Sequence, residues 1–224
     1  MFIRNFLRRT SLGFLASAAI LGPLPALATS ATLTFIDRSG NPLPGVIVLV
    51  DDGSEPVPKA AEMVQKHRAF QPNILTIAKG SPVYFPNQDN TQHHVFSFSA
   101  PKPFNIELYA DQPEAPIAFE TAGIVELGCN IHDQMKGFIV VADTGRIARS
   151  GAGGISQFDV QTLGPDGELH LKFWHPRLKD NTVALHMTLP GPLPIQQILT
   201  LDVMPEAAPA QNGLESLQKR FREL

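Results

Sequence analysis

The sequence contains a single cysteine and lacks the short motifs that mark several common protein classes. It has no C-x-x-C-H haem-attachment motif, no phosphate-binding glycine loop, no H-E-x-x-H zinc helix and no G-x-S-x-G nucleophile elbow. It also has no excess of positive charge, because the formal net charge is -3 at pH 7. These absences argue against a c-type haem protein, a P-loop nucleotide-binding protein and the enzyme classes that the other two motifs define.

Residues 1–28 have the three-part layout of an export signal. They contain three arginines and no acid, then an apolar run at residues 12–21, and they end on Ala26-Leu27-Ala28. The run is too short to span a bilayer, so cleavage is expected before Thr29. Arg8-Arg9 suggests the twin-arginine route, and the general secretion route stays equally open. The predicted destination is the bacterial periplasm, with no stable membrane insertion after cleavage.

Removal of the signal leaves 196 of the 224 residues, which suffice for one large or two small domains. Because three arginines are lost with the signal, the remaining chain has a formal charge near -6. A negative charge argues against nucleic acid and against an anionic membrane surface as partners. The 20 prolines exceed the usual share of about 5% and fall between short β-rich runs, which is typical of a loop-rich β-sandwich.

The lone Cys129 needs a specific reason in an oxidising compartment, because exported cysteines are normally paired. It lies three residues before His132 and six before Met135, and a second histidine, His93, lies upstream. Two imidazole nitrogens, one thiolate and a weak axial thioether form the trigonal set that suits an electron-transfer copper. An inert buried thiol and a disulfide to another chain are the alternatives. The neighbouring histidine and methionine favour the metal.

Residues 29–55 predict the first strands of a sandwich. Residues 32–36 alternate, residues 37–42 supply turn chemistry, and residues 46–50 form an apolar run typical of a buried strand. A strand, a turn and a buried strand in this order resemble the beginning of transthyretin-like or carboxypeptidase-regulatory sandwiches.

Residues 56–142 predict a second β-rich unit. Residues 60–70 show no clear period and are expected to form a loop or a short helix. A later strand ends just before Cys129, and an apolar strand at residues 138–141 follows the ligand loop. The remaining strands are predicted at residues 73–78, 82–85, 95–98, 104–109 and 121–128.

The phrases "FPNQDNTQHHVFSFS", "PKPFNIELY" and "GCNIHDQMKGFIVV" resemble the cupredoxins, and in particular the periplasmic plastocyanin-like proteins described as methylamine utilization proteins. The resemblance runs from about residue 60 to residue 141, and more weakly over "FWHPRL" at residues 173–178. Among cupredoxins, the short C-x2-H-x2-M loop is most similar to that of amicyanin. The resemblance implies an all-β cupredoxin Greek-key β-sandwich for residues 56–142.

Carried over residue by residue, the resemblance assigns one type 1 copper ion to His93, Cys129, His132 and Met135. His94 stands where many cupredoxins have an asparagine, so the choice of upstream ligand between the two adjacent histidines stays open. Adjacent side chains of a strand point to opposite faces, which favours His93.

The resemblance implies outer-sphere electron transfer to a redox partner protein in the periplasm rather than enzymatic catalysis. His132 is then the expected exit for the electron. A non-redox copper-binding or copper-delivery module with the same ligands is the alternative. An enzyme with Cys129 as nucleophile and His132 as base is disfavoured, because the tight loop places the pair poorly and no orienting acid is evident. A multicopper oxidase or nitrite reductase is not expected, because a second copper loop and His-x-His pairs are missing.

Residues 143–205 predict the rest of the β-structure. We expect them to pair with residues 29–55, so that the cupredoxin unit is inserted into a small transthyretin- or carboxypeptidase-regulatory-like β-sandwich. Two consecutive domains are the alternative. The predicted strands are residues 158–163 and 169–174, joined as a hairpin by a turn at residues 165–167, and residues 182–189 and 196–203.

Residues 206–224 form a tail whose apolar residues fit a short amphipathic helix: Leu214, Leu217, Phe221 and Leu224. Met63 and His67 lie near the start of the cupredoxin unit and are candidates for a second metal site. His170, His175 and His186 lack ligand spacing, so packing or surface roles are expected for them.

Overall fold

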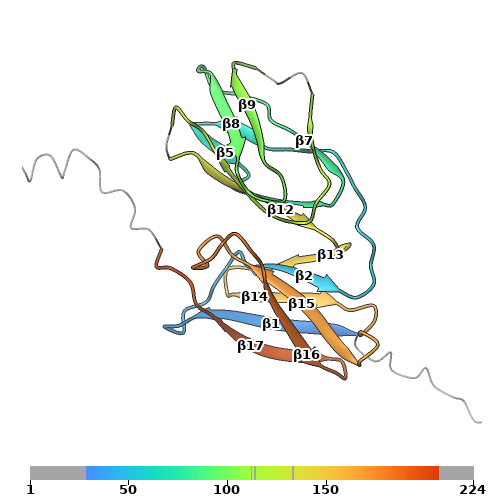
Figure 1. Cartoon of the computed structure of the whole chain (residues 1–224). Coiled ribbons are helices and arrows are strands. Elements are labelled where there is room, and N and C mark those ends of the chain that lie inside the picture. Colours follow the sequence, from blue (N-terminus) through green and yellow to red (C-terminus); the bar gives the residue numbers. More distant parts are fainter. Residues whose placement is uncertain (1–28, 112, 114, 133, 207–224) are drawn as a thin grey trace, which may run out of the picture.

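The computed structural model describes residues 29–206, with the exception of residues 112, 114 and 133. Within this part of the chain the regular elements are all β-strands, so the all-β prediction is confirmed. No helix among these residues is long and apolar enough to cross a membrane. The predicted export signal and the predicted helix of the tail lie outside the described residues. Figure 1 shows the strands gathered in two units, one above the other.

The first unit is a sandwich of two sheets whose strands come from both ends of the described chain. In strand order, one sheet contains β14 (Ile155–Asp159), β1 (Ser30–Asp37) and β17 (Ile195–Leu201), and the other contains β13 (Arg146–Arg149), β2 (Ile47–Asp51), β15 (Glu168–Trp174) and β16 (Leu185–Pro190). β1 alternates because only one of its faces packs inward, where Ala31, Leu33 and Phe35 are fully buried. These residues join those of the facing sheet in one apolar core.

The second unit lies between β2 and β13 in the chain. Its largest sheet has the order β6 (Ile74–Ala78), β12 (Lys136–Ala142), β11 (Gly123–Gly128), β8 (His93–Ser97) and β9 (Phe104–Tyr109). A second sheet has the order β10 (Ile117–Phe119), β7 (Ser81–Tyr84) and β3 (Ala61–Glu62). A two-stranded sheet pairs β4 (Val64–Lys66) with β5 (Ala69–Gln71). Neighbours that are distant in sequence, such as β6 and β12, mean that the chain crosses between sheets, as Greek-key sandwiches require. A separate apolar core fills this unit.

β2, which precedes the second unit in the chain, pairs antiparallel with β13, which follows it. The N-terminal strand β1 pairs with β14 and β17. The likeness of the first unit to transthyretin-like or carboxypeptidase-regulatory sandwiches stays a prediction.

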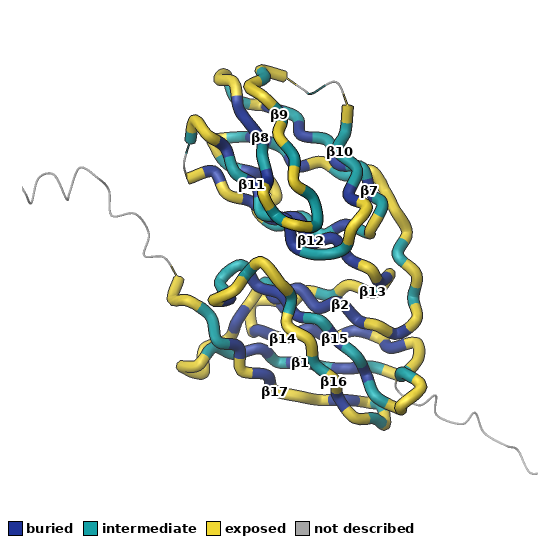
Figure 2. Tube along the Cα trace, in the orientation of Figure 1, coloured by how far each residue is buried: buried dark blue, intermediate teal, exposed yellow. Residues whose placement is uncertain are grey.

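A third apolar cluster joins the two units. Ile47 and Leu49 of β2 face Phe138 and Val140 of β12, while the alternate residues of both strands point into the cores of their own units. Both strands are therefore covered on two faces, which explains why each reads as an unbroken apolar run (Figure 2). The ring of Trp174 from β15 packs 5.0 Å from that of Phe138.

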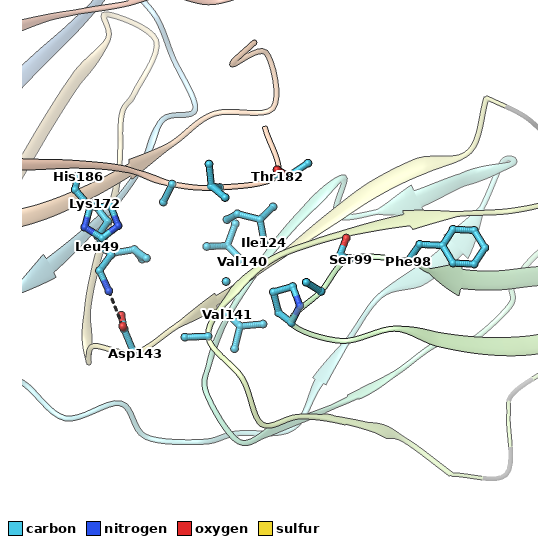
Figure 3. A pocket seen from close by; sticks show the side chains of 16 residues that line it. Leu49, Phe98, Ser99, Ile124, Val140, Val141, Asp143, Lys172, Thr182 and His186 are labelled. Atoms are coloured by element: carbon cyan, nitrogen blue, oxygen red, sulfur yellow. Dashed lines mark hydrogen bonds and ion pairs between the residues drawn. The ribbon is translucent and has the colours of Figure 1, made fainter. Parts of the chain in front are cut away.

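A pocket opens at the edge of this junction. Leu49, Ile124 and Val140 form part of its apolar wall, and an ion pair between Lys172 Nζ and Asp143 Oδ2 closes one end at 2.5 Å (Figure 3). The exposed Phe98 lies at the opposite end. The ion pair joins β15 of the first unit to the segment that leaves β12 of the second.

Two local predictions are wrong. Residues 60–70 are neither a loop nor a helix but contribute β3, β4 and β5, because His67 and Arg68 both adopt a φ of 56° and turn the chain into a tight hairpin. The predicted hairpin of residues 158–174 does not exist either. A turn forms at Gly164–Gly167, but β14 pairs with β1 in one sheet and β15 pairs with β2 and β16 in the other.

Candidate metal centre

The site lies where the ends of β8, β11 and β12 meet. β11 pairs with β12 from Gly123↔Val141 to Gly128↔Lys136, so residues 129–135 form the loop that closes this hairpin. Gly128 also pairs with Phe96 of β8, which brings Cys129 beside the start of β8. A Cβ at Gly128 would lie 2.7 Å from Phe96 Cζ, so the absence of a side chain there allows this close approach.

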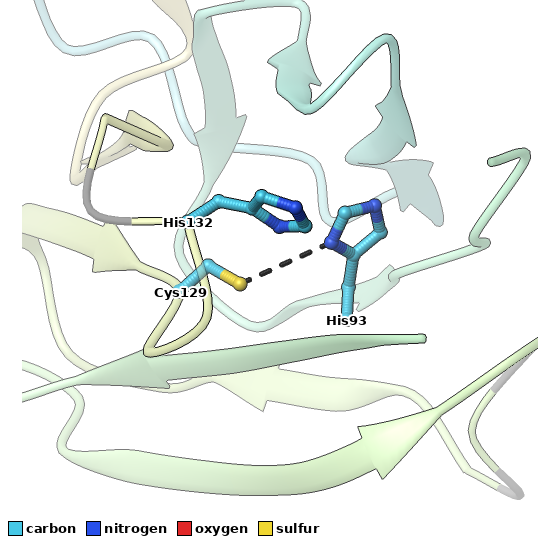
Figure 4. A group of neighbouring side chains, drawn as sticks. All are labelled: His93, Cys129 and His132. Carbon is cyan, nitrogen blue, oxygen red and sulfur yellow. Dashed lines mark hydrogen bonds between the residues drawn. The ribbon is translucent and has the colours of Figure 1, made fainter. Parts of the chain in front are cut away.

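Three predicted ligands converge. The donor atoms of His93, Cys129 and His132 lie within 4.8 Å of one another, and Cys129 Sγ is 3.9 Å from His93 Nδ1 (Figure 4). The two imidazole rings are 5.1 Å apart. His93 is fully buried and Cys129 is 5% exposed. The three residues therefore lie together, as the cupredoxin resemblance implies, and their binding of a metal stays a prediction.

His132 has a ring nitrogen that is free to bind a ligand. Its Nδ1 atom is buried and has no hydrogen-bond partner among the described residues. A buried polar nitrogen without a partner is costly, and coordination of a metal would satisfy it. The thiol and two imidazoles are donors that suit a soft or borderline transition-metal ion.

Met135 completes the predicted set from within the apolar core. It is 1% exposed, belongs to the same buried cluster as Cys129 and lines the same pocket. Its backbone N–H donates to the carbonyl of His132 at 2.8 Å, which tightens the ligand loop. The fold thus places Met135 in the same buried cluster as Cys129, and coordination of a metal by its thioether stays a prediction.

The neighbouring histidines take different positions. His93 directs Nδ1 to the cluster and uses Nε2 in a 2.8 Å contact with Asp89 Oδ2. His94 packs its ring 5.3 Å from that of Phe96 and does not belong to the cluster. His93 therefore takes the position of the upstream ligand, at a point where the register of the β8–β9 pairing shifts between His93 and Val95.

The electrostatic surroundings include groups that sequence reasoning missed. Burial alone would raise the pKa of Asp89, but hydrogen bonds from Arg68 N–H, His93 and His67 N–H hold it at about 2. Burial raises the pKa of Tyr109 to about 12, against the effect of a hydrogen bond from Gln65. Asp89 had a local signal, four residues before His93, whereas Gln65 and Tyr109 are distant in sequence and meet only in the fold.

The other candidates do not form a second centre. Met63 is fully buried in the core of the second unit, while His67 is exposed on the β4–β5 turn. Among the described residues, neither His67 nor His170, His175 or His186 joins a group of three potential metal-binding side chains. His170 instead contacts Asp166, with 2.9 Å between Nε2 and Oδ2.

No family model and no curated protein sequence matches this chain. Among solved structures, the purple cupredoxin from Nitrosopumilus maritimus is similar over 37% of this chain and 99% of its own, with 21% identity and a TM-score of 0.33. Amicyanin from Paracoccus versutus is similar over 42% of this chain and 96% of its own, with 22% identity and a TM-score of 0.32.

The copper-containing nitrite reductase from Thermus scotoductus is similar over 49% of this chain but only 28% of its own, with 23% identity and a TM-score of 0.35. At these identities and TM-scores the similarities carry no functional inference. A function has to be inferred from the chemistry of the cluster.

Proposed function

We propose that the chain is a type 1 copper protein of the periplasm that transfers electrons by an outer-sphere route. Copper would be held by His93 Nδ1, Cys129 Sγ and His132 Nδ1, with Met135 as the axial ligand. The observation that carries the proposal is the buried convergence of two imidazoles and the only thiol of the chain. The bound ion supplies the one-electron couple, and the protein supplies a fixed ligand set.

The ligand positions are set by the fold. Asp89 holds His93, the β11–β12 pairing fixes the start of the loop at Cys129, and a backbone hydrogen bond joins Met135 to His132. A site held in this way resists rearrangement when the charge of the metal changes, which favours fast electron transfer. Thiolate formation is coupled to metal binding, because the thiol must lose its proton to coordinate.

His132 is the proposed exit for the electron. It is only partly buried, and the adjacent Ile131 is 46% exposed. We place the docking site of the redox partner protein at this exposed side of His132.

Electron transfer is favoured over copper delivery by the burial of the soft ligands. Cys129 and Met135 are 5% and 1% exposed, so a partner could not reach them to exchange copper without opening the loop. A delivery module would need accessible ligands.

Export to the periplasm rests on residues 1–28, whose arginines, apolar run and Ala-x-Ala end support a cleaved signal. We propose the mature protein to be residues 29–224. An oxidising compartment suits a lone cysteine that is protected by metal coordination and burial.

The proposal is tested by titrating residues 29–224 with Cu(II) and recording the visible absorption spectrum. An intense thiolate-to-copper band that saturates at one equivalent is expected, and Cys129→Ala should abolish it. His93→Gly and His94→Gly are matched neighbours: the first should change or remove the band, while the second should keep it. A band that survives Cys129→Ala, or that depends on His94 and not on His93, would overturn the ligand assignment.

A further inference from the structure

Asp89 makes the most direct contact with a predicted ligand from outside the cluster. It lies between β7 and β8, and its side chain is 14% exposed while that of His93 is fully buried. The carboxylate accepts hydrogen bonds from His93 Nε2 at 2.8 Å, from His67 N–H at 2.6 Å and from Arg68 N–H at 2.9 Å.

The two backbone donors come from one turn. His67 and Arg68 are consecutive residues at a φ of 56°, so the β4–β5 hairpin presents both amides to the same carboxylate. Asn87 holds the loop from the other side, because its Oδ1 accepts from Asp89 N–H at 3.0 Å and its Nδ2 donates to Thr91 O at 2.8 Å. Among the described residues, no lysine or arginine side chain is hydrogen-bonded to Asp89, so its negative charge is held but not neutralised by a cation.

This arrangement fixes the role of each nitrogen of His93. A carboxylate at Nε2 requires a proton there, which leaves the lone pair on Nδ1 facing Cys129. A carboxylate partner also makes an imidazole a stronger electron donor to a metal. Stronger donation stabilises the higher oxidation state of the ion more than the lower one.

We propose that Asp89 is a positioning residue of the metal centre, whose carboxylate orients His93 and favours Cu(II) over Cu(I). The β4–β5 turn is then part of the centre, since its two amides hold the carboxylate in place. This inference rests on the proposed copper function and adds to it a determinant of the reduction potential.

Asp89→Asn tests the proposal, because it keeps the shape but leaves three donors facing a single acceptor oxygen. Loss of such a partner typically weakens metal binding by about 10- to 100-fold. If the loss affects Cu(II) alone, the reduction potential rises by about 60–120 mV, since tenfold corresponds to 59 mV for one electron. The measurement is a redox titration of the copper band in residues 29–224.

Asp166→Asn is the matched control. Asp166 makes the same four-residue contact with His170, at 2.9 Å, but lies in the first unit away from the cluster. The control should leave the potential unchanged. An Asp89→Asn potential equal to that of the parent protein, or a shift equal to that of the control, would overturn the proposal.

A metal-free measurement separates this proposal from the copper assignment. In the apoprotein, NMR should find the neutral His93 ring protonated at Nε2, with that proton exchanging slowly with water. Exchange should be faster in Asp89→Asn. A proton on Nδ1 of the parent protein would refute the positioning role even if Asp89→Asn failed to fold. If the Nε2 proton is protected in the apoprotein but added copper gives no type 1 spectrum, only the copper function is refuted.

Discussion

Replacement of Phe138 by alanine tests whether packing at the junction of the two units stabilises the protein. Phe138 belongs to β12 of the second unit, is 7% exposed and packs 5.0 Å from Trp174 of the first. Truncation of a buried phenylalanine to alanine typically costs about 3–5 kcal/mol. At about 2–4 °C per kcal/mol for a chain of this size, the Tm of the metal-free protein should fall by about 6–20 °C.

The assay is thermal and urea unfolding of residues 29–224, followed by far-UV circular dichroism and by fluorescence. Trp174 is the only tryptophan, so its emission reports on the junction itself. Phe98→Ala is the matched control, because Phe98 is 87% exposed and its truncation should change stability by no more than about 0.5 kcal/mol. If Phe138→Ala lowers the free energy of unfolding by less than about 1 kcal/mol, or by no more than the control does, the junction does not stabilise the protein as described.

Three further changes test other parts of the structure. Burial and nearby arginines lower the pKa of His175 to about 4, so the folded protein resists protonation of this residue. The protein should therefore lose stability as the pH falls from 6.5 to about 4. His175→Gln should make the urea midpoint less dependent on pH over that range. Gly128→Ala would bring a Cβ to 2.7 Å from Phe96 Cζ and should lower the free energy of unfolding in urea by about 1–3 kcal/mol. Adding Phe96→Leu should restore part of this stability, and no restoration would contradict the explanation. Arg68→Gly relieves a left-handed φ of 56° and should raise the urea midpoint by the equivalent of about 1 kcal/mol; a lower midpoint would contradict it.

The closeness of Cys129 and His132 could be predicted because these residues are local in the sequence. Cys129, His132 and Met135 fall within seven residues, and such a loop has few ways to arrange three donors. His93 is 36 residues from Cys129, and its place followed from the family resemblance and the alternation of β8. Asp89 was missed although it lies only four residues before His93; the two backbone amides that hold its carboxylate come from a turn more than 20 residues away, which only the fold brings to it.

Strand pairing was harder to predict than strand position. The turn at residues 165–167 exists, but turn residues alone do not determine whether the strands on its two sides belong to the same sheet. The apolar run of β2 was correctly expected to be buried and that of β12 was expected as a strand, yet nothing in either run identifies the other as its partner across the junction. In residues 60–70, two non-glycine residues at positive φ hide a tight turn that a glycine would have signalled.

The central claim is most directly tested by the EPR spectrum of residues 29–224 loaded with one equivalent of Cu(II). A cysteine thiolate and two imidazoles in trigonal arrangement should give a narrow copper hyperfine splitting, and this signal should disappear and return as the protein is reduced and reoxidised. A wide splitting typical of tetragonal copper, or a signal that reoxidation does not restore, would contradict the assignment of an electron-transfer centre to His93, Cys129, His132 and Met135.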